Sequence, residues 1–171
     1  MRILREMSAR MGDMADQSFA LVPASYVLLL RGREVLLQRR QNTGYMDGFW
    51  VAGAAGHVEP GETSRQAAVR EVREELGVDI DAGNLELATV MQRTDGVGVP
   101  REQRVDWFWT CRKWAGEPRI CEPEKASDLG WFRLTDLPDP MPAYERVVLV
   151  GLRDGSLPMA TAFGFVNRTG R

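Results

Sequence analysis

Residues 56–78 read GHVEPGETSRQAAVREVREELGV, and this stretch decides the fold. Thr63 is a favourable N-cap, and Gln66 three residues later completes a capping box. Gly77 is a favourable left-handed stop at the other end. Together these signals predict a helix over 64–76, preceded by a glycine-containing loop.

The faces of this predicted helix differ in chemistry. At 3.6 residues per turn, one stripe is apolar and consists of Ala68, Val69, Val72 and Leu76. An adjacent face carries Glu71, Glu74 and Glu75. Because the helix macrodipole disfavours anions at the C-terminus, the last two glutamates are unfavourable there without a cation.

A solvated acidic surface is the alternative explanation for this charge run. Such a surface would scatter lysines among the glutamates, whereas the intervening residues here are apolar or arginine. Carboxylate oxygens are the ligands that hard cations such as Mg²⁺ prefer. The pattern therefore favours a metal site that serves phosphate chemistry.

Length and composition indicate one domain. The chain has 171 residues, of which 44% are hydrophobic, and this is enough to bury a core. We expect the domain over 21–155, with a flexible N-terminal extension at 1–20 and a C-terminal tail at 156–171. The net charge of −2, without a strongly basic stretch, argues against a nucleic-acid polymer as partner.

Other sequence features concern the compartment. Cys111 and Cys121 are not spaced as a metal motif, and we expect both thiols to stay reduced in the cytoplasm. No apolar run reaches membrane-spanning length, so no membrane partner is expected.

The rest of the chain alternates apolar strands with turns. Residues 25–30 and 34–39 predict a hairpin, and 143–153 predict a second helix. Further strands are expected at 85–93, 103–114 and 130–134. Strands interleaved with two helices indicate an α/β layered domain.

At every defined position, residues 56–78 resemble the Nudix box of the Nudix hydrolases, the MutT-like family. The matching residues are Gly56, Glu62, Arg70, Glu71, Glu74, Glu75 and Gly77, with Val72 and Val78 at the aliphatic positions. The resemblance implies the Nudix fold, a mixed β-sheet sandwiched between α-helices. It also implies Mg²⁺-dependent hydrolysis, with Mn²⁺ as a substitute, of the diphosphate linkage in a nucleoside diphosphate derivative. The substrate would be a small nucleotide, for example a triphosphate cleaved to monophosphate and pyrophosphate, and family members often form homodimers.

The resemblance also assigns roles to residues of the box. Glu71, Glu74 and Glu75 would bind the metal together with the backbone carbonyl of Ala55. Arg70, as a rigid five-donor fork, would hold a neighbouring carboxylate such as Glu62 or Glu74. The expected catalytic residues are Arg70, Glu74, Glu75 and Glu122.

Glu122 is assigned by its place in a second similar segment. In MutT-like proteins a Trp-Phe-Trp strand precedes Gly-Glu-Pro and then a glutamate that assists catalysis. Here 107–109 read Trp-Phe-Trp, 116–118 read Gly-Glu-Pro, and Glu122 follows. Glu124 is a rival, and an exposed loop acid without function is the alternative.

Substrate contacts are expected from Arg40, Arg104 and Tyr144, with Arg101 as a weaker candidate. Arg40 would hold phosphate or sugar, although a solvated arginine at a strand end is the alternative. Tyr144 stands where readers of oxidised purines use asparagine, and a phenol cannot make the paired contacts of an amide. Specificity for oxidised guanine is therefore not expected.

Aromatic and histidine side chains complete the candidates. A base could stack on Tyr45, Phe49, Trp50, Trp107 or Trp109, although alternation along the 107–111 strand directs some of these into the core. His57 is the single histidine, and it stands at a variable position of the box. We therefore expect a structural or solvent-facing role for it.

Two alternative functions come from other classes. Isopentenyl diphosphate isomerases share a version of the fold but need a catalytic cysteine just before the box glycine, where this chain has Ala54 and Ala55. A non-catalytic nucleotide sensor is the other alternative. Such modules usually lose box carboxylates, and all of them are present here.

Overall fold

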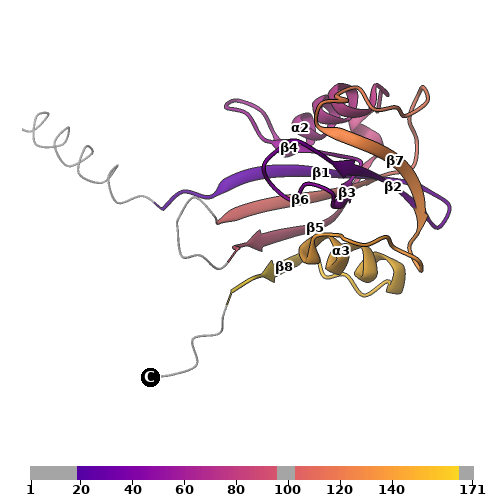
Figure 1. The fold of residues 1–171 in the computed structure, drawn as a ribbon. Helices are drawn as coiled ribbons and strands as arrows, with labels where there is room; N and C mark the ends of the chain where they lie inside the picture. The colour runs from indigo at the N-terminus through magenta and orange to yellow at the C-terminus, as the bar shows by residue number, and fades with distance from the viewer. Residues whose placement is uncertain (1–18, 96–102, 166–171) are drawn as a thin grey trace, which may run out of the picture.

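The computed structural model describes residues 19–95 and 103–165. The predicted extension at 1–20 and the candidate Arg101 therefore lie largely or wholly outside the described residues. The elements, in chain order, are β1 (Val22–Arg31), β2 (Glu34–Arg40), β3 (Trp50–Ala52), β4 (Ala54–His57), α2 (Ser64–Glu71), η1 (Val72–Leu76), η2 (Ala82–Asn84), β5 (Leu85–Arg93), β6 (Arg104–Cys111), β7 (Ala126–Arg133), α3 (Ala143–Asp154) and β8 (Ala160–Phe163) (Figure 1).

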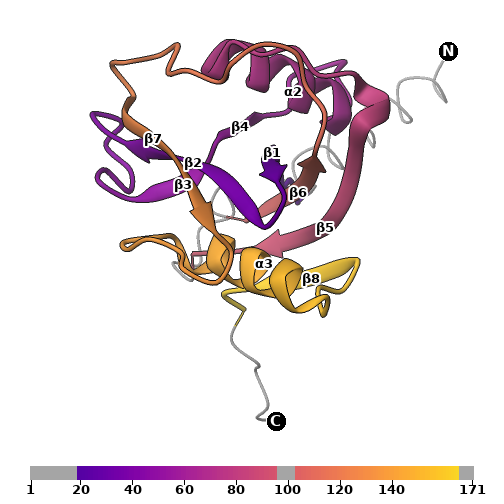
Figure 2. The same ribbon diagram turned by 90° about the vertical axis from the view of Figure 1, so that its right-hand side faces the viewer.

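The strands form one mixed sheet in the order β3-β2-β1-β6-β5-β8, with β4 paired to β1 and β7 paired to β2. β1 runs parallel to β6, and β5 runs parallel to β8, while the other pairs are antiparallel. Helix α2 lies on one side of the strands and α3 on the other (Figure 2). The expected mixed sheet between helices is confirmed.

Two hydrophobic clusters hold these layers together. Beneath α2, the buried Ala68, Val72 and Leu76 pack against β1 and β6. On the opposite side, Tyr144 and Val148 of α3 belong to a second cluster. Strand β1 contributes alternate residues to both clusters, because successive side chains of a strand point to opposite faces. The strand is consequently buried along most of its length.

Local signals place the box helix as expected. The Thr63 hydroxyl accepts a hydrogen bond from the Gln66 backbone N–H, and the Gln66 side chain accepts one from the Thr63 N–H. Gly77 ends the helix with a positive φ of 65°. The last turn, Val72–Leu76, is a π-helix, a feature that the α-helical pattern did not predict.

The structure contains strands that were not predicted from the sequence, or were predicted with other bounds. Strands β3 and β4 lie within residues 50–57, where no strand was predicted. Strand β7 begins at Ala126, ahead of the predicted 130–134. Strand β8 lies in the segment assigned to a C-terminal tail, and it extends the sheet by pairing with β5. No helix in the described residues is long and apolar enough to cross a membrane.

The capping box gives a test of what holds the site helix in place. Thr63→Ala removes the hydroxyl acceptor and should lower the free energy of unfolding by about 1 kcal/mol. Thr63→Ser keeps the hydroxyl and should retain most of that stability. Chemical denaturation of both variants measures the difference, and an equal loss in both would show that the cap contributes nothing.

Candidate active site

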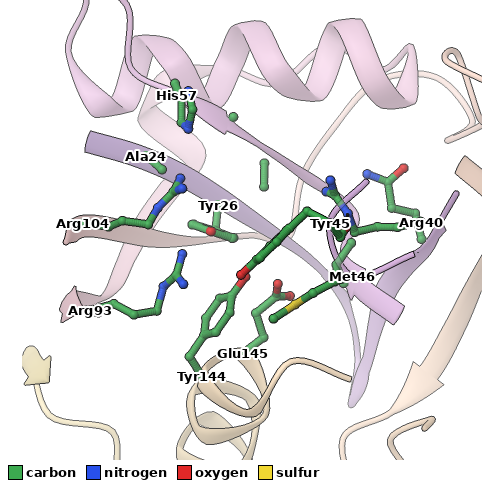
Figure 3. A pocket seen from close by; sticks show the side chains of 14 residues that line it. Ala24, Tyr26, Arg40, Tyr45, Met46, His57, Arg93, Arg104, Tyr144 and Glu145 are labelled. Carbon is green, nitrogen blue, oxygen red and sulfur yellow. Dashed lines mark hydrogen bonds between the residues drawn. The ribbon is translucent and has the colours of Figure 1, made fainter. Parts of the chain in front are cut away.

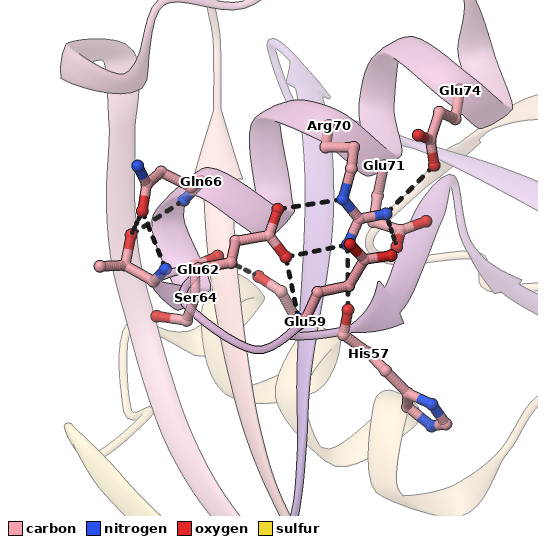
Figure 4. A network of polar contacts seen from close by, with 10 residues as sticks. His57, Glu59, Glu62, Ser64, Gln66, Arg70, Glu71 and Glu74 are labelled. Atoms are coloured by element: carbon pink, nitrogen blue, oxygen red, sulfur yellow. Dashed lines mark hydrogen bonds and ion pairs between the residues drawn. The ribbon is translucent and has the colours of Figure 1, made fainter.

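Arg70 is the centre of a polar network on the box helix (Figure 4). Its guanidinium donates to both oxygens of Glu62, each at 3.0 Å. It also donates to Glu71 at 2.6 Å, to Glu74 at 3.1 Å and to the backbone carbonyl of His57 at 3.0 Å. Hydrogen bonds with the carboxylates, that to Glu62 above all, raise the pKa of Arg70. One planar cation therefore joins the loop, the helix and the end of β4.

Glu71 lies against the backbone of β4. A Cβ atom at Gly56 would collide with the Glu71 carboxylate, so only glycine fits at this position. Burial raises the pKa of Glu71, while the hydrogen bond from Arg70 lowers it. The box glycine thus makes the space into which this carboxylate is packed.

Glu75 lies between the box helix and strands β2 and β4. Its Oε2 accepts a hydrogen bond from the Ala55 N–H at 3.0 Å and from the Gln38 amide at 3.1 Å. Burial, with the added negative charges of Glu71 and Glu122, raises its pKa to about 8. A carboxylate in this environment is stabilised by a nearby cation.

The loop that carries Glu122 is tied to the end of the helix. The Cys121 N–H donates to the Glu75 carbonyl at 3.0 Å, and the Arg119 N–H donates to the Leu76 carbonyl at 3.0 Å. Glu122 itself forms an ion pair with Lys125 at 2.7 Å. These backbone bonds bring Glu122 close enough to raise the pKa values of Glu71 and Glu75.

The carboxylate oxygens of the box suit a divalent cation, although Glu62, Glu71 and Glu74 are arranged around Arg70. Within 19–95 and 103–165, no three Asp, Glu, His or Cys side chains converge in the arrangement of a formed metal site. Arg70 contacts Glu71 and Glu74 and neutralises part of their charge. The partly buried Glu75 accepts hydrogen bonds from neutral donors, the Ala55 N–H and the Gln38 amide. Carboxylate oxygens on a helix that repel one another are appropriate ligands for Mg²⁺ or Mn²⁺.

A cavity of about 250 Å³ adjoins these carboxylates between the sheet and the start of α3 (Figure 3). It is lined by Ala24, Tyr26, Gln38, Arg40, Tyr45, Met46, Val51, Ala55, Gly56, His57, Arg93, Arg104, Tyr144 and Glu145. Among the expected substrate residues, Arg40, Arg104 and Tyr144 all line it. Gln38, Ala55 and Gly56 connect the cavity to the carboxylates of the box.

Arginines stand on two sides of this cavity. Arg40 donates to the Tyr45 carbonyl at 3.0 Å, and its guanidinium lies 6.0 Å from the centre of the Tyr45 ring. Arg104 lies 3.5 Å from the Asp106 carboxylate, which already accepts a 2.8 Å hydrogen bond from Arg93. Within the described residues Arg40 pairs with no carboxylate, and Arg104 shares Asp106 with Arg93, so both guanidinium groups keep donor capacity toward the cavity.

The wall between these arginines contains a buried network that sequence reasoning missed. Arg93 is almost fully buried, pairs with Asp106 and Asp95, and stacks 3.9 Å over the Tyr144 ring. Tyr144 in turn makes an edge contact with Tyr26. In the sequence, Arg93 stands at the end of an apolar strand. An arginine in that position is ordinarily solvated, so burial was not predicted.

Glu145 is the second missed residue. It is 2% exposed, and it accepts a hydrogen bond of 2.6 Å from the Ala52 N–H of β3. Burial raises its pKa to about 7, although hydrogen bonds from Ala52 and Tyr144 lower it. A glutamate in the first turn of a helix is ordinarily exposed, so no sequence feature placed Glu145 on the cavity wall.

Several other candidates lie away from the cavity. Trp107 and Trp109 belong to the cluster beneath α2, on the opposite face of β6 from Phe108. Trp50 packs edge-on against Phe132.

Two further candidates do line the cavity. Tyr45 is 43% exposed there, so among the aromatic residues named from the sequence it is the one on which a base could stack. His57 lines the cavity as an exposed residue, and partial desolvation of its ring, followed by the positive charge of Arg104, lowers its pKa.

Comparisons with known proteins agree with this geometry. The profile described as NUDIX domain matches residues 20–150. The chain is 34% identical over 118 residues to the NAD-capped RNA hydrolase NudC of Stutzerimonas stutzeri, covering 69% of this chain and 38% of that protein. A second NudC, from Pseudomonas putida, is 32% identical over 126 residues and is covered to 39%. The chain thus spans about two fifths of the length of these curated relatives.

A solved structure gives the same result for the fold. The MutT NUDIX hydrolase of Burkholderia pseudomallei superposes with a TM-score of 0.69 at 29% identity. This match covers 77% of the present chain and 97% of the other.

The buried Glu145 predicts a pH-dependent contribution to stability. The folded state keeps the proton up to a pKa of about 7, whereas the ordinary value is 4.5. The contribution is therefore complete below pH 4.5 and is lost as pH rises through 7, by up to about 3 kcal/mol. Urea unfolding at pH 5 and pH 8 should show Glu145→Gln gaining stability relative to the parent protein as pH rises. Glu117→Gln, at an exposed position, serves as the control. If the difference in free energy of unfolding between Glu145→Gln and the parent is the same at both pH values, the assignment is contradicted.

Proposed function

Because the chain belongs to the Nudix hydrolase family, we propose that it hydrolyses the diphosphate linkage of a nucleoside diphosphate derivative with Mg²⁺. Mn²⁺ would substitute for Mg²⁺. A nucleoside triphosphate would give monophosphate and pyrophosphate. The observation that carries the proposal is a complete set of box carboxylates beside a cavity lined by arginines, with Glu62, Glu71 and Glu74 held by Arg70.

The proposed metal ligands are Glu71, Glu74, Glu75 and the backbone carbonyl of Ala55. A bound divalent cation would neutralise non-bridging phosphate oxygens and lower the pKa of a water. Arg70 would hold these carboxylates in position, since its guanidinium already bridges Glu62 of the loop and Glu71 and Glu74 of the helix. Glu122 would assist catalysis from the loop that is tied to the helix end.

Substrate would enter the cavity with its phosphates toward the box. We assign Arg40 and Arg104 to phosphate or sugar contacts, because both line the cavity and their guanidinium groups keep donors that a phosphate could use. Arg104 shares its carboxylate partner Asp106 with Arg93. Tyr144 would contact the group beyond the diphosphate. The small volume of the cavity, about 250 Å³, favours a small-molecule nucleotide.

The proposal includes the compartment and the oligomeric state of the protein. We place it in the cytoplasm, since Cys111 and Cys121 are both free thiols. It would act as a monomer or as a homodimer.

Two alternatives predict different behaviour. A nucleotide sensor would bind nucleotide without turning it over. An isoprenoid diphosphate isomerase would rearrange its substrate without releasing phosphate, and Ala54 and Ala55 supply no thiol for that chemistry. Metal-dependent phosphate release therefore distinguishes hydrolysis from both.

A substrate panel tests the proposal. Canonical and oxidised nucleoside triphosphates, nucleotide sugars, ADP-ribose, NAD and other dinucleotides are assayed for phosphate and pyrophosphate release with Mg²⁺ or Mn²⁺. Glu74→Gln/Glu75→Gln should lose at least a hundredfold in turnover, because two proposed metal ligands are removed. Equal activity in this variant would contradict the metal assignment, and tight nucleotide binding without turnover would favour the sensor.

Glu122 has its own test. Glu122→Gln should lower kcat at least tenfold, because the amide can no longer serve as an anionic ligand or base. The matched variant Glu124→Gln, at an exposed position of the same loop, should remain near parental activity. Steady-state kinetics on the best substrate of the panel decides between them, and the opposite ranking would transfer the role to Glu124.

A further inference from the structure

The positive charges of the chain are unevenly distributed, despite a net charge of −2. Five exposed cations gather where the β1–β2 hairpin, the end of β6 and the end of β7 meet. We call this surface the basic end; its cations are Arg31, Arg33, Arg112, Lys113 and Arg133. It lies away from the cavity, since Ala24 on the cavity wall and Arg31 are separated by about 23 Å along β1.

Strand pairing brings these residues together from distant parts of the chain. In the ladders, Glu34 is the partner of both Arg31 on β1 and Arg133 on β7. Arg112 donates to the Gly32 carbonyl at 3.1 Å, which fixes the end of β6 to the hairpin turn. The cations therefore sit on a rigid sheet end and not on a loose loop.

The basic end is hollowed on both sides of Arg31. One depression of about 540 Å³ is lined by Leu30, Arg31, Gly32, Arg112, Lys113 and Trp114. A second of about 380 Å³ is lined by Arg31, Arg33, Glu34, Arg133 and Thr135. Because Arg31 lines both, the two depressions are adjacent, one on each side of its side chain.

Aromatic rings border this surface. The Arg31 guanidinium lies 4.2 Å over the Trp131 ring, and Trp131 stacks on Trp114 with ring centres 5.8 Å apart. The indoles hold Arg31 in place, and Trp114 presents part of its ring to the first depression. Arginines beside aromatic rings are the groups that recur where single-stranded nucleic acids bind.

Positive charge at the basic end is poorly compensated. Glu34 is the single acid that lines either depression, and it is already paired with Arg31 at 3.3 Å. The side chains of Arg33 and Lys113 have no hydrogen-bond or ion-pair partner within the described part of the chain. Neighbouring like charges on a rigid surface repel one another, and a polyanion would relieve this repulsion.

We propose that the basic end binds the phosphate backbone of a single-stranded nucleic acid. Several cations spread over two adjacent depressions match a ligand with repeating charges better than one compact phosphate. Stable anchoring on a membrane would call for a second signal, such as exposed apolar groups, beside the basic residues. The large apolar residues that are exposed, Phe19, Tyr45, Val147, Met159 and Phe165, line neither depression.

The binding test uses the full chain with EDTA, so that its outcome does not depend on hydrolysis. Fluorescence anisotropy of a labelled oligouridylate, about twelve nucleotides long, is measured between 50 and 200 mM KCl. With all five cations engaged, the slope of log K against log salt should approach about −3.5, which is a loss of roughly a hundredfold over this range. Absence of binding at 50 mM KCl would overturn the proposal.

A matched pair of double variants locates the site. Arg33→Gln/Lys113→Gln removes two cations without side-chain partners and should make the slope shallower by about 1.4. Arg73→Gln/Arg153→Gln removes the same charge from exposed or partly exposed positions elsewhere and should bind like the parent chain. Equal loss in both double variants would overturn the assignment to the basic end. Equal competition by poly-glutamate of the same charge would overturn the nucleic-acid assignment in favour of an acidic polypeptide.

Discussion

The whole candidate site depends on one guanidinium. Arg70 is contributed by the helix, yet its donors reach the acid of the preceding loop, two acids of its own helix and a carbonyl at the end of β4. A planar fork with five donors can satisfy acceptors from several directions at once, which an ammonium cannot do in the same geometry. Arg70 thereby keeps mutually repelling carboxylates together and sets the distance between helix and sheet.

Features encoded within a few neighbouring residues were predictable from the sequence. The capping pair Thr63 and Gln66, the stop at Gly77 and the apolar stripe of the helix act locally, and the structure has each of them. The hairpin, strand β5 and helix α3 also followed from apolar periodicity and turn residues. The contiguous box likewise gave the family, because its residues are spaced along a single helix and loop.

Features that depend on contacts between distant segments were not predictable. Arg93 is buried because Asp106 on the neighbouring strand and Tyr144 on α3 enclose it, and neither is close to it in sequence. Glu145 is buried because an N–H of β3 faces the first turn of α3. Strands β3 and β4 are short and contain small residues, so their strand character comes from pairing and not from propensity. The basic end was not predicted because the net charge is a sum over the whole surface. Such a sum conceals a local excess of positive charge.

The stacked indoles of Trp114 and Trp131 have a spectroscopic consequence. Their rings are 5.8 Å apart and inclined by 19°, which is close enough for the two transition dipoles to couple as an exciton pair. One indole lies beyond the end of β6 and the other on β7, so the coupled signal exists only while these distant segments are packed together. The molecule therefore carries its own optical reporter of tertiary structure at the sheet end, and circular dichroism can follow it without a label.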